Sequence, residues 1–371
     1  MLETEIPLAI EVMKDALLRK LGGEVDLIFQ YGSHLKGAAH RYSDVDLSYA
    51  PVHETTGESI TVMVGETLID LYPMHWSHLE HMAEFNDISS IVLLESRILY
   101  QRTEASAERF RALSTRLRAL LLPEAQPQMI RKAQEIFRNA SYPYYLLRQQ
   151  AAGNHWLGCV QQAQSILRTT LHCLAVYNQA PIDTRKMAQV LALPELPGGF
   201  AGTVERIAGS LDPDELLSAC EMLLQTTRDF LLSAQRRVLR PATTFPAVFS
   251  SGFPELMGDL QHVMLACERR DMSSLKTSLV SLYQELSLGI NRVLTGVEYS
   301  NFNALSEYEQ DLAAFGFPPL LPYLETGDFE QLHQQCLAFG EHLKQFLAER
   351  SVELNAYATL DELRTALSAA G

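Results

Sequence analysis

The chain has 371 residues, 47% of them hydrophobic and 20% charged, which is typical of a globular protein and argues against long disordered tracts. The sequence contains no run of about eighteen apolar residues, so no membrane span is expected. The formal net charge is −15, and residues 1–100 alone contribute −10, with sixteen acidic and six basic residues. Because a polyanion needs a cationic surface to bind, nucleic acid is a disfavoured partner.

Length and cysteine usage set further expectations. A chain of this length predicts two or three domains. The acidic N-terminus, residues 1–5, lacks the basic and apolar segments of an export signal, so a cytoplasmic location is expected. Five cysteines stand singly in helical patterns, which favours reduced core thiols over disulfides or a zinc site.

The first elements along the chain lead to a glycine turn. Residues 6–21 carry apolar side chains at helical spacing and end at two glycines, which predicts a helix. Residues 25–31 form a short apolar run rich in β-formers and are expected to be a buried strand. The strand ends at Gly32, which lets the backbone approach a ligand closely, and Ser33 adds a hydroxyl. Together they predict a nest for phosphate oxygens.

Acidic residues follow on two further strands. Residues 44–50 are predicted to be a strand, and alternation places Asp44 and Asp46 on one face. Two carboxylates on one face suit Mg²⁺, which takes its other ligands from water and substrate phosphates. Asp70, on a predicted strand at residues 67–73, would complete a two-metal centre. Lys36 and Arg41, in the loop between the first two strands, are candidate phosphate contacts, although exposed basic residues near a turn are often solvated only.

These residues carry a family resemblance. Gly32-Ser33, Lys36-Gly37 and the segment 43–47 resemble the signature of the polymerase-β-like nucleotidyltransferase superfamily, over about the first hundred residues. The resemblance implies a nucleoside triphosphate, ATP first among them, as co-substrate. It also implies two Mg²⁺ ions held by Asp44, Asp46 and Asp70, and transfer of a nucleoside monophosphate to an acceptor hydroxyl.

The rest of the chain predicts a fold of the α+β class. Strands at residues 59–64 and 97–101 would join a mixed sheet with helices on it, and a helical period begins at about residue 105. Long helices are predicted at residues 129–145 and 155–177, and proline-rich breaks at residues 193–202 and 240–254. Asp212, Asp271 and Asp328 are predicted helix N-caps. The expected domains are a nucleotidyltransferase domain at 1–122, a helical bundle at 123–240 and a second helical domain at 253–371.

The helical region loosely resembles that of kanamycin nucleotidyltransferase and its relatives. In those proteins a glutamate from the helical domain acts as general base, and the resemblance implies Glu135 for that role. A solvated helix-face glutamate is the competing interpretation, and Asp70 is the alternative base.

Three functions stay open at this point. The first is transfer to a small acceptor such as an aminoglycoside-like compound, and the acidic field favours a cationic one. The second is a protein adenylyltransferase of antitoxin type, and the third is a nucleotide-binding regulator that does not turn over. A homodimer is a further expectation, because active sites of this superfamily sometimes span two subunits.

Overall fold

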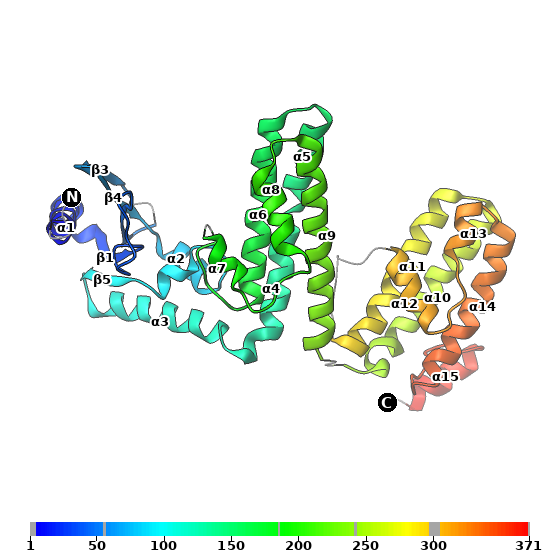
Figure 1. Ribbon diagram of the computed structural model, residues 1–371. Coiled ribbons are helices and arrows are strands. Elements are labelled where there is room, and N and C mark those ends of the chain that lie inside the picture. Colours follow the sequence, from blue (N-terminus) through cyan, green and yellow to red (C-terminus); the bar gives the residue numbers. More distant parts are fainter. Residues whose placement is uncertain (1–4, 55–56, 185, 241–242, 297–304, 370–371) are drawn as a thin grey trace. The chain divides into compact units, whose positions relative to one another are not determined.

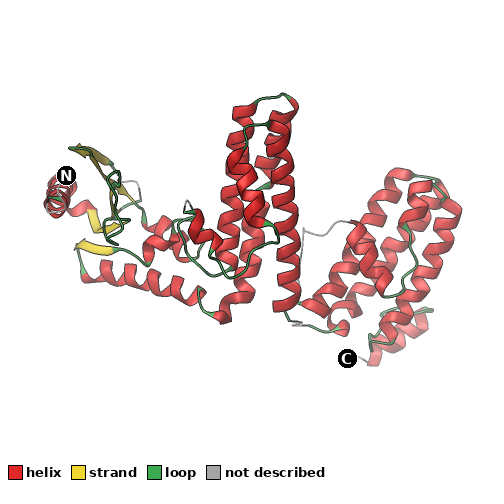
Figure 2. Cartoon of the chain, viewed as in Figure 1, coloured by secondary structure: helices red, strands yellow, loops and turns green. Residues whose placement is uncertain are grey.

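The computed structural model describes residues 5–54, 57–184, 186–240, 243–296 and 305–369. Strands and short helices come first and a long helical region follows (Figures 1 and 2), which confirms the predicted α+β class. The chain divides into two compact units, Met1–Leu231 and Leu232–Gly371. The three predicted domain ranges remain predictions. No helix in the described part of the chain is long and apolar enough to cross a membrane.

The described strands of the first unit form one mixed sheet. They are β1 (Val25–Tyr31), β2 (Val45–Pro51), β3 (Ile60–Val64), β4 (Thr67–Pro73) and β5 (Arg97–Gln101). Their order across the sheet is β3-β4-β2-β1-β5, and the pairing is antiparallel except between β2 and β4, which are parallel. The central position of β2 therefore brings β1 and β4 to its two sides.

One face of this sheet is apolar and covered by a helix. Helix α1 (Ile6–Leu21) buries Ile10, Met13 and Leu17, which recur every three to four residues along one side. These side chains share a core with alternate residues of the strands, among them Leu47 and Leu71. The alternating pattern read from the sequence thus corresponds to burial beneath α1.

The opposite face carries polar side chains at one end. Tyr31 pairs in register with Asp46, and Asp46 pairs with Asp70 on the parallel neighbour, so these three lie in a row across the sheet. Farther along the same face, Phe29 packs against Phe110, with ring centroids 5.0 Å apart. Phe110 belongs to helix α3 (Glu104–Leu120), which therefore covers part of this face and leaves its polar end for other contacts.

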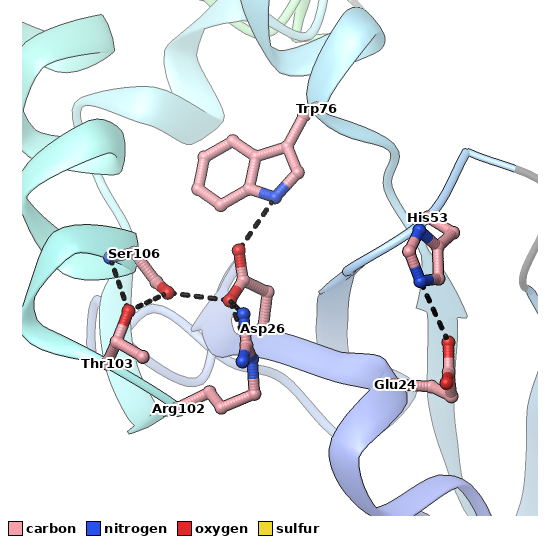
Figure 3. A network of polar contacts seen from close by, with 7 residues as sticks. All are labelled: Glu24, Asp26, His53, Trp76, Arg102, Thr103 and Ser106. Atoms are coloured by element: carbon pink, nitrogen blue, oxygen red, sulfur yellow. Dashed lines mark hydrogen bonds and ion pairs between the residues drawn. The ribbon is translucent and has the colours of Figure 1, made fainter.

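A buried carboxylate near the start of β1 joins this strand to two helices (Figure 3). Asp26 accepts hydrogen bonds from Trp76 Nε1 at 3.2 Å, from Ser106 Oγ at 2.6 Å, and from Arg102 Nε at 3.1 Å. Arg102 also forms an ion pair with it at 3.0 Å. Trp76 begins helix α2 (Trp76–Ala83) and Ser106 lies in the first turn of α3, so one side chain fixes β1 to both helices.

The remaining elements of the first unit are mostly helices around a second core. They are η1 (Gly22–Glu24), η2 (Ser90–Leu93), η3 (Pro123–Ala125), α4 (Gln126–Arg138), α5 (Ser141–Ala152), α6 (Trp156–Tyr177), α7 (Met187–Leu191), α8 (Phe200–Gly209) and α9 (Pro213–Val238). Buried residues of α6, α8 and α9 form a common cluster. Helix α4 is joined to the end of α2 by a hydrogen bond from Lys132 Nζ to the carbonyl of Glu84.

The second unit has its own aromatic-rich core. Its described helices are α10 (Phe245–Arg269), α11 (Met272–Thr295), α12 (Leu305–Ala314), α13 (Leu321–Thr326), α14 (Phe329–Ala348) and α15 (Leu360–Ala369). Phe249, Tyr283 and Phe339 are among its largest buried side chains. The predicted N-caps are confirmed. Asp271 accepts from Ser273 N at 3.0 Å, and Asp328 from Gln331 N at 3.0 Å. Asp212 caps α9 in the same way, accepting from Glu215 N at 2.8 Å.

Three predicted boundaries are wrong. The helix expected at residues 129–145 is two helices, α4 and α5, because the chain turns at Asn139, whose amide donates a hydrogen bond to the carbonyl of Ile136 at 3.0 Å. The breaks expected at residues 193–202 and 240–254 end early, since α8 begins at Phe200 and α10 begins at Phe245. Pro246 is tolerated in the first turn of α10, where the missing N–H has no partner to lose, and Pro254 lies inside the helix.

Candidate nucleotide site

The site begins at the turn after β1. Gly32 has a φ of +85°, a left-handed conformation that glycine adopts without steric cost. A Cβ at this position would lie 2.0 Å from Oδ2 of Asp46, well inside van der Waals contact. Two independent constraints therefore demand glycine here, the backbone angle and the carboxylate directly above its α-carbon.

The loop that follows is held by its own hydrogen bonds. Ala38 N donates to Ser33 O at 3.0 Å, and Gly37 has a φ of +65° at the bend. At the other end of the loop, His40 N donates to Ser43 Oγ at 2.9 Å, and Ser43 N to His40 O at 2.9 Å. These bonds bring the loop back to the start of β2, where the acidic residues stand.

A cavity of about 720 Å³ opens over this loop. Its lining residues come from the Gly32 turn and its loop, from β2 and β4, from the segment around η2, and from α6 and the segment after it. They are Tyr31, Gly32, Ser33, Lys36, Ala38, His40, Tyr42, Ser43, Asp44, Asp46, Tyr72, Ile88, Ser89, Ile91, Val92, Glu95, Arg168, Asp183, Thr184 and Lys186. The volume is within the range of small-molecule sites.

Two of the three predicted metal ligands line this cavity. Asp44 is exposed just before β2, and Asp46 is half-buried within it. Asp70 is the register partner of Asp46 but is not among the lining residues, because its Oδ1 accepts a hydrogen bond from Thr61 on the neighbouring strand β3. Within the residues that the structure describes, no group of three or more acidic, histidine or cysteine side chains is arranged to hold a metal ion. The predicted three-carboxylate cluster is thus not assembled.

Of the predicted basic phosphate contacts and the predicted general base, one lines the cavity and two do not. Lys36 lines the cavity, where it forms an ion pair with Glu95. Arg41 lies outside the lining, 3.3 Å from Glu66 and over the ring of Tyr42. Glu135 is exposed on α4 and is not a lining residue either, so the structure brings neither Arg41 nor Glu135 to the cavity.

Two carboxylates in the lining are candidate ligands of a magnesium ion. Asp44 and Asp46 offer carboxylate oxygens beside the Gly32 turn, and Mg²⁺ is commonly held by one or two carboxylates together with waters and substrate phosphates. This pair therefore fits an ion that enters with a nucleotide. A second ion would require Asp70 to turn away from Thr61.

Two tyrosines form part of the cavity wall next to Asp46. The hydroxyls of Tyr31 and Tyr72 are hydrogen-bonded to each other across β2. Burial raises the pKa of Tyr31 well above its ordinary value, and the nearby Tyr72 and Asp46 raise it further. Tyr31 therefore stays protonated and serves as a hydrogen-bond donor rather than as a base. Both residues could have been found from the sequence, because Tyr72 is two positions from Asp70 on a strand and Tyr31 precedes Gly32.

Other lining residues had no signal in the sequence. Arg168, on α6, and Asp183, Thr184 and Lys186, in the segment after it, reach the cavity from the helical region. Asp183 is about a fifth exposed and has Lys186 Nζ at 3.9 Å from Oδ2. Their sequence surroundings are those of an ordinary helix and an ordinary inter-helix segment, so only the folded arrangement identifies them.

Comparison with known proteins gives little beyond this geometry. No family model matches the chain. No curated protein matches it either. Nine chains of solved structures match, among them a nucleotidyltransferase-like protein from Exiguobacterium sibiricum 255-15. The match covers 63% of this chain and 82% of that one at 15% identity, with a TM-score of 0.29. These values are too low to carry the properties of that protein over to this one.

Proposed function

We propose that this chain is a nucleotidyltransferase that moves a nucleoside monophosphate from a nucleoside triphosphate, ATP being the first to test, to the hydroxyl of a small acceptor. The observation that carries the proposal is the close approach of Asp46 to Gly32. It sets a carboxylate beside a side-chain-free turn at the edge of a 720 Å³ cavity, with Ser33 next in the chain. Such a turn suits phosphate oxygens, and such a carboxylate suits their counter-ion.

Each chain element then has a role. The backbone at Gly32 and the hydroxyl of Ser33 bind phosphate oxygens, and Lys36 adds a positive charge once it leaves Glu95. Asp44 and Asp46 hold Mg²⁺, with Asp70 as the reserve ligand for a second ion. When bound, the metal supplies positive charge that offsets the charge developing on the phosphates.

The reaction is an in-line displacement. The acceptor hydroxyl oxygen attacks the α-phosphorus, the bond from that phosphorus to the bridging oxygen breaks, and pyrophosphate leaves. The hydroxyl proton must pass to a base within reach of the cavity. Asp183 takes this role in place of the exposed Glu135, because it is a carboxylate on the cavity wall contributed by the helical region.

The lining of the cavity also indicates which chemical class of acceptor it would bind. Its described lining residues include three lysine or arginine side chains and four carboxylates, so their charges are close to balanced. The remaining lining is largely hydroxyl-bearing or aliphatic. This mixture favours a small polar acceptor, with a cationic group tolerated, over a polyanion.

A transfer assay tests the proposal. The purified chain is incubated with Mg²⁺ and α-labelled nucleotides, ATP first, against a panel of aminoglycosides and other hydroxylated compounds, and separately against cell lysate. Label on a small compound is expected. Label on a protein would point to an adenylyltransferase of antitoxin type, and binding without any transfer would point to a nucleotide-binding regulator. Absence of binding would overturn the proposal.

A further inference from the structure

Among the described residues, Arg168 lines the cavity without a carboxylate partner, in contrast to several other arginines of the first unit. Arg102, Arg109, Arg111 and Arg116 each form an ion pair with a carboxylate, at 3.0 Å or less. Arg168 lines the cavity and is exposed, and within the described part of the chain no ion pair or hydrogen bond engages it. A guanidinium without a partner at the wall of a cavity has its donors available to a ligand.

The helix fixes where this side chain points. Ile166, Leu167 and Leu171 are buried in the core that α6 shares with α8 and α9. Arg168 lies on the other side of the helix, away from that core, and is thereby presented to the cavity. Its backbone is held in the middle of a 22-residue helix, so the group is positioned by a rigid element.

Among the lining residues that the structure describes, the two lysines are already engaged. Lys36 is paired with Glu95, and Lys186 Nζ lies 3.9 Å from Asp183. A triphosphate brings three to four negative charges, and one carboxylate-bound metal ion offsets only part of them. Among the lysines and arginines that the structure describes in the lining, Arg168 is therefore the one that can accept an anion without first giving up a carboxylate.

We propose that Arg168 binds the outer phosphates of the nucleotide, so that the helical region distinguishes a triphosphate from a monophosphate. This inference rests on the proposed function and deepens it. The planar guanidinium matches two phosphate oxygens at once, which a lysine cannot do. An anionic group on the acceptor is the second source of the same chemistry, and the experiment separates the two.

The test compares nucleotide binding by variants of the full chain. Calorimetry in Mg²⁺ measures the affinity for ATP, ADP, AMP and inorganic triphosphate. Arg168→Gln is expected to lower the affinity for ATP and for inorganic triphosphate by about tenfold or more and to leave the affinity for AMP unchanged. Arg168→Lys should recover part of the loss. Arg131→Gln is the matched control, because Arg131 is exposed on α4 and lies outside the lining.

The outcomes separate this inference from the proposed function. ATP affinity equal in the native chain and in Arg168→Gln would overturn the role of Arg168 and leave nucleotide binding intact. An unchanged ATP affinity with a raised KM for the acceptor would assign Arg168 to an anionic acceptor and would also overturn it. Failure of the native chain to bind any of the four ligands would overturn both.

Discussion

Gly32 meets two constraints that arise from different parts of the chain. Its φ of +85° is set by the turn at the end of β1, and the Asp46 carboxylate above it is set by the register of β2 against β1. A side chain at this residue would have to move Asp46, which the proposed function uses as a metal ligand. Stability and ligand binding are therefore coupled at a residue that has no functional group of its own.

Replacing Gly32 with alanine tests this coupling. The added Cβ would strain the backbone at a cost of about 1–3 kcal/mol and displace the Asp46 carboxylate. We expect Gly32→Ala to lower the free energy of unfolding in urea and to abolish ATP binding by calorimetry. Gly65→Ala is the control, since Gly65 has a φ of +61° but open space where its Cβ would go. Equal ATP affinity in the two variants would contradict the coupling.

A second residue-scale prediction concerns Asp26, at the opposite end of β1. The Asp26 carboxylate accepts hydrogen bonds from three side chains. Asp26→Asn replaces one of its oxygens by an NH2 group, which can only donate, and it leaves Arg102 without its counter-ion. We expect a loss of about 2–4 kcal/mol of stability in urea. ATP affinity should stay unchanged because the residue lies outside the cavity lining.

The matched control for Asp26 is visible beside it in Figure 3. Glu24 contacts His53 at 3.9 Å with both side chains largely exposed, so Glu24→Gln should cost less than about 1 kcal/mol. A stability loss as large in Glu24→Gln as in Asp26→Asn would show that burial of the network is not what matters.

Among the elements, the segment after α2 borders the cavity and carries a pH-dependent contact. His78, on α2, lies 3.4 Å from Asp87, and Asp87 also accepts from Ser89 N at 2.7 Å. The hydrogen bond to Asp87 raises the pKa of His78 above its ordinary value of 6.5, and the hydrogen bond to His78 holds the pKa of Asp87 well below 3.8. The contact thus links α2 to Ser89, a lining residue.

The pair should stabilise the fold between about pH 4 and pH 6.5. Above that window, the contribution of His78 is lost as pH rises through its raised folded pKa. Below it, the contribution of Asp87 is lost as pH falls through its lowered folded pKa. His78→Ala should therefore lower the free energy of unfolding in urea more at about pH 5.5 than at about pH 8.5, by less than about 1 kcal/mol because the histidine is half exposed. An equal loss at both pH values would refute this assignment.

Elements with strong alternation or helical spacing could be predicted from the sequence, and those that depend on distant contacts could not. The strand at 25–31 follows from a short apolar run that is buried along its length up to Gln30, and the strand at 67–73 follows from buried alternate residues. The single helix expected at 129–145 fails because apolar spacing continues across the turn at Asn139. Gly32, Ser33, Lys36, Asp44 and Asp46 are local to one loop, and the structure places them in the lining of the cavity. Arg168 and Asp183 reach it through tertiary packing, and Asp70 is withheld from it by Thr61.

For the whole molecule, two compact units with separate cores predict two unfolding steps. The candidate site lies entirely in the unit Met1–Leu231, and the second unit has its own aromatic core. A ligand raises the stability of the part that binds it, by about 2.7 kcal/mol at a hundred times its Kd. Calorimetric melting should show two transitions, of which Mg²⁺ and ATP raise only one. A single transition, or an equal rise in both, would contradict independent units.

The proposed function depends most directly on magnesium-dependent nucleotide uptake at Asp44 and Asp46. Titration calorimetry should detect ATP binding to the native chain with Mg²⁺ and much weaker binding without it. Asp46→Asn and Asp44→Asn should lose the Mg²⁺-dependent part while keeping the melting profile of the native chain, because asparagine keeps the shape of the side chain and removes one negative charge from the pair. ATP binding that is indifferent both to Mg²⁺ and to these substitutions would contradict the account.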